Sequence, residues 1–577
     1  MRFSGEARGL SALFAALLAG HAAFAQETVQ TATLAPAPLA APPAPPVLPP
    51  LSPEALALRA AMEAASAGWD PAERADVLGF YAARGFAPYW ADQGRGVALV
   101  ALLEEAPAHG LPPARYGAAG LADGLTGSLA APDRIAALEL AGSRSWIAFA
   151  GDLKAGVLVP SRVDPEIDVR PARPGRAALL ALLDGGEAAA IARSLEPKTR
   201  DYRALMAEKA RLEGQSAADW GPTVPTGPTM RQGDAGPRVA ALRARLAARG
   251  HPAAASEARV PAGIEGGVAA GVGAGVFDAG LDAALKGFQA EAGLEPDGLA
   301  GAQTVAALNE GPEGRLRQVA ANLERMRWNN SDLGPRYIVA NIPDYQVRMV
   351  ENGRVVFESR VVVGRADTTR TPEFQQDMTY FVVNPTWHIP DSIAQRVYLP
   401  KLKKNPNTLA NSNMRIFTRS GTEIDPGLVD FTQFSQGNFP FRIKQNPSDA
   451  NALGRVKFMF PNQFSIYLHD TPHRELFAKT ERDFSNGCVR VEKPLDLAYV
   501  LLEGQVADPR AAFDGWLAAK TEKTVMLKQP VPVRIEYRTV FLDDAGRVQH
   551  RFDIYGRDAK VARALEAKGV TLAGAQG

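Results

Sequence analysis

Apolar residues recur at helical spacing through the N-terminal part of the chain. Leu56, Leu58, Ala61 and Met62 fall on one helix face, and the leucines of residues 179–183 repeat the pattern. Strand-like alternation is scarce here. We therefore predict a helical scaffold domain over residues 53–226. Its dense aromatic run, Phe80 to Trp90, is expected in the core, because aromatic side chains dominate core packing.

The spacing of apolar residues changes from helical to strand-like near residue 335. Residues 346–357 form two strand-like runs about Asn352-Gly353, the strongest short signal for a β-hairpin. A helix predicted over residues 313–334 precedes this region and is expected to return to the scaffold, since its apolar stripe has the spacing of a packed helix. We predict a mainly-β domain over residues 335–528 and a C-terminal β-hairpin extension over residues 529–577. The fold class is multidomain α+β.

Residues 227–312 carry a third pattern. An amphipathic helix follows Arg231, and the phrases Phe288-Gln289, Asp297-Gly298 and Leu308-Asn309 come later with short spacings. This segment resembles the small three-helix peptidoglycan-binding module. The resemblance implies binding to cell-wall glycopeptide, and the alternative is a packing module that has lost this binding.

The first residues have the pattern of an export signal. Arg2 and Arg8 precede a short apolar run, and Ala23-Phe24-Ala25 matches a cleavage site, so residues 1–25 are predicted to be a secretory signal peptide. Residues 26–52 are rich in alanine and proline and are predicted to form an extended linker. We expect a periplasmic, cell-wall-associated protein, or one attached to a membrane where the signal stays uncleaved.

Charge and cysteine content narrow the function classes. Lysine and arginine number 64 against 63 aspartate and glutamate, which argues against a dedicated nucleic-acid binder. The single cysteine, Cys488, excludes an intrachain disulfide and any zinc site built on several cysteines. An unpaired thiol in an exported protein is a candidate reactive group.

The candidate chemistry lies around this thiol. In the predicted strand 465–469, alternation puts Tyr467 and His469 on the face opposite Ile466 and Leu468. Cys488 follows nineteen residues after His469, directly after Gly487. An imidazole near the thiol would favour the thiolate and then protonate a leaving amine, and backbone N–H groups of the glycine turn would hold an oxyanion. This combination indicates acyl transfer, and the alternative is a buried cysteine beside a core histidine.

Two phrases carry a family resemblance. Tyr467-Leu-His469-Asp-Thr-Pro and Ser485-Asn-Gly-Cys488-Val-Arg490 resemble the catalytic signature of the YkuD-type L,D-transpeptidases. The wider frame resembles the YcbB-like subgroup, which has a helical scaffold, an inserted peptidoglycan-binding module and a capping segment, here about residues 391–450.

The resemblance implies a role for each residue of the motif. Cys488 would be the nucleophile and His469 the base, oriented by the carbonyl or the side chain of Asp470. Many relatives have histidine where Asn486 stands, which removes a second imidazole. The residues expected to bind the oxyanion or to orient the turn are Gly487, Asp470, Ser485 and Arg490. Those expected to bind the substrate are Tyr467, Trp387 and Asn486.

The resemblance also implies a reaction. The thiol attacks the third residue of a peptidoglycan tetrapeptide stem, D-alanine leaves, and an amine of a second stem resolves the thioester into a 3→3 cross-link. No metal or cofactor is implied, and carbapenem-type β-lactams would be inhibitors. Water as acceptor would give an L,D-carboxypeptidase, and a protein amine would give tethering to the wall. A non-catalytic wall-binding scaffold and, more distantly, a cysteine protease are the competing functions.

Overall fold

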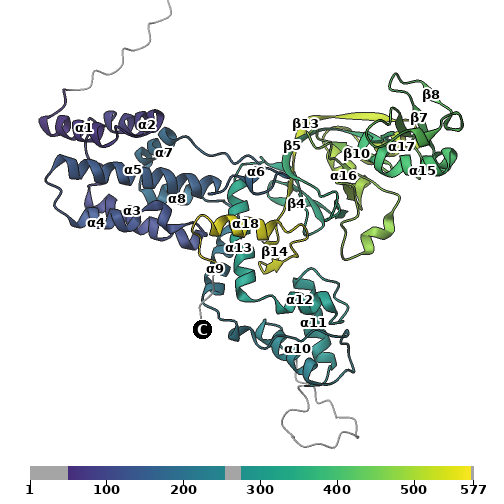
Figure 1. Cartoon of the computed structure of the whole chain (residues 1–577), viewed down its shortest axis with the longest axis horizontal. Coiled ribbons are helices and arrows are strands. Elements are labelled where there is room, and N and C mark those ends of the chain that lie inside the picture. Colours follow the sequence, from purple (N-terminus) through teal and green to yellow (C-terminus); the bar gives the residue numbers. More distant parts are fainter. Residues whose placement is uncertain (1–49, 254–274, 573–577) are drawn as a thin grey trace, which may run out of the picture. The chain divides into compact units, whose positions relative to one another are not determined.

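The computed structural model describes residues 50–253 and 275–572, and Figure 1 shows how their elements follow one another. The predicted signal peptide and all but the last residues of the predicted linker lie outside this described part. The described part contains a helical scaffold, a small three-helix module and a mainly-β domain. This agrees with the predicted multidomain α+β class.

Residues 53–213 are helical, as the apolar spacing indicates. Helices α1 and α2 begin at prolines preceded by capping side chains: the Ser52 Oγ accepts the N–H of Ala55 at 3.2 Å, and Asp70 Oδ1 accepts that of Glu73 at 2.9 Å. The helices are α1 (Pro53–Ala65), α2 (Pro71–Ala82), α3 (Gln93–Glu104), α4 (Ala118–Thr126), α5 (Pro132–Ala155), α6 (Pro160–Val163), α7 (Arg176–Ala181), α8 (Ala188–Leu195) and α9 (Arg200–Glu213).

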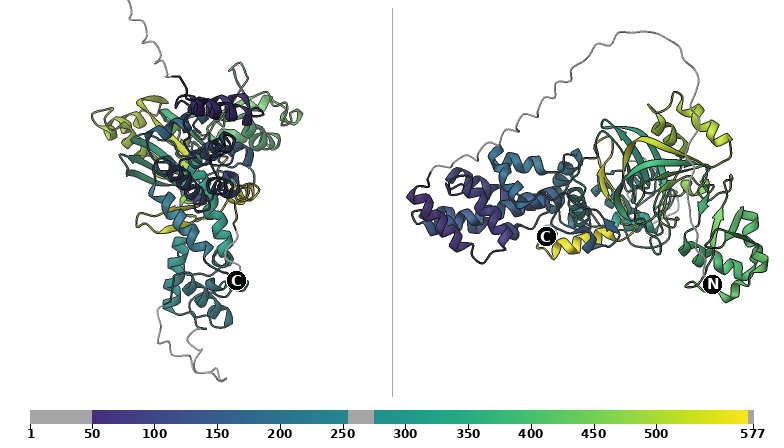
Figure 2. Two further views of the ribbon diagram at one scale, coloured as in Figure 1. Left: turned by 90° about the vertical axis from the view of Figure 1, so that its left-hand side faces the viewer. Right: turned by 90° about the horizontal axis from the view of Figure 1, so that it is seen from above.

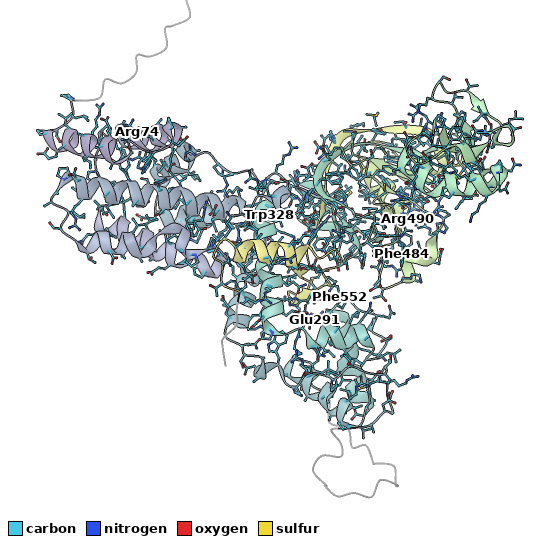
Figure 3. The ribbon with its side chains drawn as sticks, in the orientation of Figure 1. Arg74, Glu291, Trp328, Phe484, Arg490 and Phe552 are labelled. Carbon is cyan, nitrogen blue, oxygen red and sulfur yellow. The ribbon has the colours of Figure 1, made fainter. Side chains whose placement is uncertain are left out.

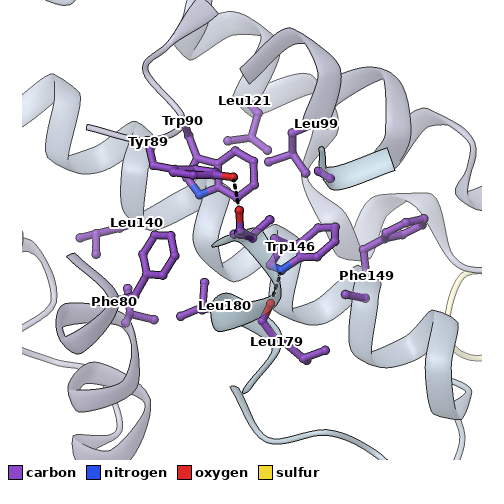
Figure 4. Packing of buried hydrophobic residues seen from close by; sticks show 14 of the residues in the cluster. Phe80, Tyr89, Trp90, Leu99, Leu121, Leu140, Trp146, Phe149, Leu179 and Leu180 are labelled. Atoms are coloured by element: carbon purple, nitrogen blue, oxygen red, sulfur yellow. Dashed lines mark hydrogen bonds between the residues drawn. The ribbon is translucent and has the colours of Figure 1, made fainter. Parts of the chain in front are cut away.

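The predicted aromatic core is confirmed. Phe80, Tyr81 and Trp90 are buried and pack with Trp146 of α5 (Figure 4), whose indole N–H donates to the Leu179 carbonyl at 2.8 Å. Buried Glu139 holds the start of the loop after this run, because its carboxylate accepts the backbone N–H groups of residues 89–91. Aromatic burial and this carboxylate together fix the loop to α5.

Three helices make up the small module, as its motifs indicate: α10 (Pro237–Ala248), α11 (Ala279–Glu291) and α12 (Ala302–Asn309). Leu242, Leu285, Phe288 and Leu308 are buried between them. Helix α13 (Pro312–Trp328) then packs beside α9 of the scaffold, sharing a core with Tyr202 and Leu205.

The predicted mainly-β domain is built on one sheet of nine strands within the described residues. Their order is β1-β5-β10-β11-β12-β4-β3-β2-β13, and β13 also pairs with β5, so the sheet closes on itself as a barrel (Figure 2). The predicted hairpin about Asn352-Gly353 joins β3 to β4. The strands are β1 (Ile167–Asp168), β2 (Arg336–Asn341), β3 (Gln346–Glu351), β4 (Arg354–Val362), β5 (Glu373–Val383), β10 (Val456–Met459), β11 (Leu468–His469), β12 (Val489–Val491) and β13 (Lys523–Glu536).

A second, four-stranded sheet of order β6-β9-β7-β8 lies in the expected capping segment. It has its own core, which includes Leu402, Ile416 and Phe439. The sheet begins at β6, before residue 391, so Trp387 belongs to this unit. Its elements are β6 (Trp387–His388), α14 (Asp391–Ile393), α15 (Leu399–Lys404), β7 (Met414–Phe417), β8 (Glu423–Ile424) and β9 (Arg442–Gln445).

The C-terminal boundary differs from the prediction. Residues 529–536 are not part of a separate hairpin, because β13 runs on through them and pairs with β2 and β5. Val531, Val533 and Ile535 alternate into the barrel core, which makes this stretch a closing strand. The hairpin proper is β14 (Val540–Leu542) with β15 (Val548–His550), followed by α18 (Arg557–Glu566). Helices α16 (Pro494–Leu502) and α17 (Pro509–Ala518) lie between β12 and β13 in the chain.

Candidate active site

Two short parallel strands carry the predicted pair, His469 and Cys488, on neighbouring segments. Leu468 of β11 pairs with Val489 of β12, and His469 pairs with Arg490. The Val489 N–H donates to the Tyr467 carbonyl at 3.1 Å, which extends this register back to Tyr467 and Cys488. Since side chains alternate, Tyr467, His469, Cys488 and Arg490 lie on one face of the sheet. Ile466, Leu468 and Val489 fill the core on the other.

His469 is held as a neutral base. Its Nδ1 lies 2.5 Å from the Asp470 carbonyl oxygen, and because a carbonyl only accepts, Nδ1 carries the proton and Nε2 is left as the acceptor. The ring is buried. Burial, and secondly the charge of Arg490, lower the pKa of His469 to about 3.

Cys488 is half-buried, and its thiol makes a weak hydrogen bond of 3.8 Å to the Ser465 carbonyl. Burial raises the pKa of the Cys488 thiol to about 11, although hydrogen bonding to Tyr467 and the charge of Arg490 act in the opposite direction. Between these two pKa values the Cys488 thiol and the His469 imidazole are therefore both neutral. An ion pair of thiolate and imidazolium is not favoured before a substrate is bound.

The turn before the thiol is braced by Ser485. Its buried Oγ donates to the Cys488 carbonyl at 2.6 Å and accepts the Gly487 N–H at 3.0 Å. Gly487 has a φ of +112°, where a side chain would be strained. The Gly487 N–H is thus already bonded to Ser485 Oγ. The Cys488 N–H, by contrast, has no hydrogen-bond partner in the residues that the structure describes.

A second brace comes from the loop between β4 and β5, which the motif spacing did not assign a role. Buried Thr371 donates from Oγ1 to the Gly487 carbonyl at 2.7 Å and accepts the Gly364 N–H at 2.9 Å. The Thr369 hydroxyl donates to the Ser485 carbonyl at 2.9 Å. A Cβ at Gly364 would lie 2.0 Å from the Thr369 carbonyl oxygen, so this close approach requires glycine. In the sequence, the Thr371-Pro372 pair is the feature of this loop that could have pointed to Thr371.

The Asp470 side chain points away from the imidazole. Its Oδ2 accepts the Arg455 N–H at 2.9 Å, and its carboxylate forms ion pairs with Arg455 and Arg474 at 3.3 and 3.4 Å. Of the two candidates for orienting His469, the carbonyl makes the contact.

Aromatic side chains form one wall of the site. The ring of Tyr467 lies 5.6 Å from that of His469, and it packs against both the barrel core and the capping core. Burial, then the adjacent Cys488, raise the pKa of Tyr467 well above its usual value. Trp387 of β6 lies in the capping core. A hydrogen bond to Trp387 partly offsets the rise in the pKa of Tyr467, so Trp387 reaches the same wall.

Three arginines surround the turn. The exposed Asn486 Oδ1 accepts from Arg365 at 3.2 Å and from Arg396 of the capping unit at 3.4 Å. The half-buried Arg490 follows the thiol by two residues, and its Nε has no partner. Among the described residues none of the three guanidinium groups forms an ion pair, although the charge of Glu475 acts on Arg490 from a distance, so the surroundings of the turn are positively charged.

Among the described residues, no group of three or more histidine, cysteine, aspartate or glutamate side chains is placed to hold a metal ion. No helix in this part of the chain has both the length and the apolar character needed to cross a membrane.

Comparison with known proteins gives three family matches along the chain. Residues 335–510 match the L,D-transpeptidase catalytic domain (YkuD), residues 75–208 match a scaffold domain, and residues 235–308 match a domain described as "Putative peptidoglycan binding domain". A curated protein of Haemophilus influenzae, named "Putative L,D-transpeptidase", is 34% identical over 249 residues. That match covers 42% of this chain and 49% of the relative, so the chain spans about half of the relative's length.

Solved structures give only loose superpositions. An L,D-transpeptidase from Mycobacterium smegmatis is 11% identical with a TM-score of 0.18, covering 35% of this chain and 58% of that one. A fragment of the L,D-transpeptidase from Xylanimonas cellulosilytica is 15% identical with a TM-score of 0.16, covering 54% and 99%. Superpositions this loose carry no weight. The sequence matches show that residues 335–510 are similar to the L,D-transpeptidase catalytic-domain family, with matches to a scaffold domain and to the domain described as "Putative peptidoglycan binding domain" before them in the chain.

Proposed function

We propose that this chain is an L,D-transpeptidase that forms 3→3 cross-links in peptidoglycan through a thioester on Cys488. The observation that carries the proposal is the parallel register of β11 and β12, which puts His469 and Cys488 on one face, with the proton of His469 fixed on Nδ1. The family match over this region supports the same chemistry.

The first half-reaction follows from the neutral pair. As Cys488 Sγ attacks the carbonyl carbon of the third stem residue, Nε2 of His469 takes the thiol proton. The tetrahedral oxyanion accepts the unpartnered Cys488 N–H, while Gly487 and Ser485 hold the turn. Collapse breaks the bond to D-alanine, whose amine takes the proton from His469 and leaves. A thioester remains.

The second half-reaction reverses these roles. An amine of a neighbouring stem attacks the thioester carbonyl and passes a proton to His469. Collapse of this intermediate releases the cross-linked product, and the thiolate takes the proton back. This acceptor distinguishes cross-linking from hydrolysis by water and from tethering of a protein.

The positive charge of the turn fits the proposed donor. A tetrapeptide stem ends in a carboxylate, and guanidinium groups bind carboxylates through charge-assisted hydrogen bonds. We infer that Arg365, Arg396 and Arg490 attract this end of the donor, and that Tyr467 and Trp387 line its path. The transpeptidase and peptidoglycan-binding domains indicate a cell-wall-associated protein, and we propose the periplasm as its location.

Intact-protein mass spectrometry tests the thioester. The wild-type chain incubated with a carbapenem is expected to gain the mass of one drug molecule, and Cys488→Ala is expected to gain none. A folded wild-type protein that never forms this adduct would contradict the proposal and favour a non-catalytic wall-binding scaffold.

Product analysis then tests the acceptor. Purified disaccharide tetrapeptide incubated with the enzyme is expected to give a 3→3 dimer and free D-alanine. Disaccharide tripeptide without dimer would identify an L,D-carboxypeptidase instead.

A further inference from the structure

A pocket of about 490 Å³ lies away from the thiol, where the small module meets α13 and the C-terminal hairpin. This is within the size range of small-molecule sites. Its walls come from segments far apart in the chain. They are Ala292, Ala306 and Ala307 of the module, Glu310, Gly314, Arg315, Arg317 and Gln318 about the start of α13, His550 to Asp553 from the end of β15 onward, and Asp558 and Ala559 of α18.

Arg315 brings an unpaired charge to this pocket. The residue is 7% exposed, its Nη1 donates to Gln318 Oε1 at 3.0 Å, and its Nε has no partner. In the described residues it forms no ion pair. A buried guanidinium bonded only to a neutral amide is costly, and an anionic ligand would remove that cost.

Glu310 supplies the opposite charge. Its carboxylate lies over Gly314, where a Cβ would be 1.5 Å from Oε1, so the missing side chain makes room for it. It forms no ion pair with Arg315, or with any other described residue, although its charge acts on Arg315 across the pocket. The two charges face the same space without meeting.

The other ionisable groups of the lining are already engaged. Arg551 pairs with Asp344 at 2.7 Å, Arg317 with Glu566 at 3.2 Å, and Asp558 with Arg325. Asp553 accepts the Tyr537 hydroxyl and two backbone N–H groups at the start of α18. His550 accepts no charge, because burial and Arg315 hold its pKa well below 6.5. Arg315 and Glu310 are left for a ligand.

We propose that this pocket binds the zwitterionic end of a peptidoglycan stem peptide, with the carboxylate on Arg315 and the ammonium on Glu310. A diamino acid in the stem has such an end. One of its amines lies in the peptide chain, and the other is free and shares a carbon with a free carboxylate. The identity of the ligand therefore rests on the proposed function.

Adjoining hollows connect this pocket with the catalytic turn. A second pocket shares Ala292, Arg551 and Phe552 with the first. A third shares Gln303, Thr480 and Glu481 with the second and ends at Phe484, the residue before Ser485. Phe552 and Phe484 are labelled in Figure 3. Shared lining residues thus lead from Arg315 along the module to Phe484.

Calorimetric titration of the full chain tests the pocket. The probes are meso-diaminopimelate, which is zwitterionic, and glutarate, which has carboxylates alone. Cys488→Ala protein is used with disaccharide tripeptide so that no turnover occurs. Arg315→Met is expected to weaken binding of meso-diaminopimelate at least tenfold. Glu310→Gln is expected to weaken meso-diaminopimelate but not glutarate. Arg563→Gln is the matched control, because Arg563 of α18 is exposed, lies outside the pocket lining and bonds only the Ala559 carbonyl.

Three results would overturn the proposal. They are unchanged binding in a folded Arg315→Met protein, equal binding of glutarate and meso-diaminopimelate, and equal loss in Arg563→Gln. Gly314→Ala, which displaces the Glu310 carboxylate and leaves Arg315 in place, must behave as Glu310→Gln does. Carbapenem acylation of the wild type separates the two proposals: binding without acylation ends the proposed function alone, and acylation with unchanged Arg315→Met binding ends the pocket alone.

Discussion

At the scale of single residues, the candidate site depends on where two protons lie: one on Nδ1 of His469 and one on the thiol of Cys488. Nδ1 of His469 is committed to the Asp470 carbonyl, so only Nε2 is available to the thiol. The pKa of His469 is lowered to about 3 and that of Cys488 raised to about 11. Over the range between these values both groups are neutral, so in the proposed mechanism the thiol proton would leave only during the attack.

This pairing predicts an unusual pH profile. The base form of His469 persists down to its lowered pKa, and Cys488 stays protonated up to its raised pKa, so neither titrates near neutrality. The rate constant of carbapenem acylation, followed by mass spectrometry, is expected to stay flat between about pH 5 and pH 9 and to rise only as the thiolate forms. A bell-shaped profile with inflections near pH 6 to 8 would contradict the neutral pair.

His469→Gln removes the base while keeping a side chain of similar reach. We expect acylation to slow by about 10²–10⁴-fold, the usual contribution of a positioned base. Stopped-flow loss of carbapenem absorbance measures it. His473→Gln is the matched control, since His473 is exposed and pairs with Glu475. Equal losses in both variants would remove His469 from the proposed mechanism.

At the scale of elements, the catalytic turn depends on the loop between β4 and β5. Thr371 satisfies the Gly487 carbonyl and the Gly364 N–H at once. The strand pair β11–β12 contributes only short ladders, so these side-chain bonds carry much of the geometry.

Thr371→Val keeps the shape of the side chain and deletes both hydrogen bonds. Leaving two buried backbone groups unpaired is expected to cost about 1–3 kcal/mol each. Thermal unfolding is therefore expected at a lower temperature, and acylation at a lower rate. The control is Thr368→Val, because Thr368 is exposed and bonds only Asp367. A Thr371→Val protein with wild-type melting and acylation would show that the turn does not need this brace.

The capping unit meets the same turn through Asn486, which joins Arg396 to Arg365. Asn486→Asp would place a carboxylate between these arginines and neutralise the charge proposed to attract the donor. We expect kcat/KM for a tetrapeptide donor to fall about tenfold, equivalent to about 1.4 kcal/mol. Asn486→Gln keeps the neutral amide and should fall less. An unchanged kcat/KM in Asn486→Asp would contradict carboxylate recognition by this pair of arginines.

At the scale of the whole molecule, α13 connects the parts. It packs beside α9 of the scaffold and α18 at the other end of the sequence, as Figure 1 shows for α13 and α18. Buried Arg325 of α13 pairs with Asp558 of α18, and Asn322 binds Thr539 before β14. The first turn of the same helix supplies Arg315 to the proposed pocket.

Arg325→Met tests this connection. Removing one partner of a buried ion pair leaves Asp558 uncompensated and is expected to cost about 3–5 kcal/mol of unfolding free energy. Urea unfolding followed by tryptophan fluorescence measures it. Arg59→Met breaks an exposed pair with Glu63 and is expected to cost well under 1 kcal/mol. Similar costs for both variants would mean that the buried pair adds no stability.

Local patterns in the sequence determined much of the secondary structure of this protein. The helical spacing of residues 53–226, the Asn352-Gly353 hairpin, the three-helix module and the outward face of Tyr467 and His469 follow from rules that act within a few residues. Tertiary structure decided the rest. The register of β11 against β12, the reach of Thr371 to Gly487, the closing of the barrel by residues 529–536 and the pocket that the module, α13 and residues 550–553 form around Arg315 depend on contacts between distant segments. No local periodicity encodes such contacts, because they are set by the packing of whole elements.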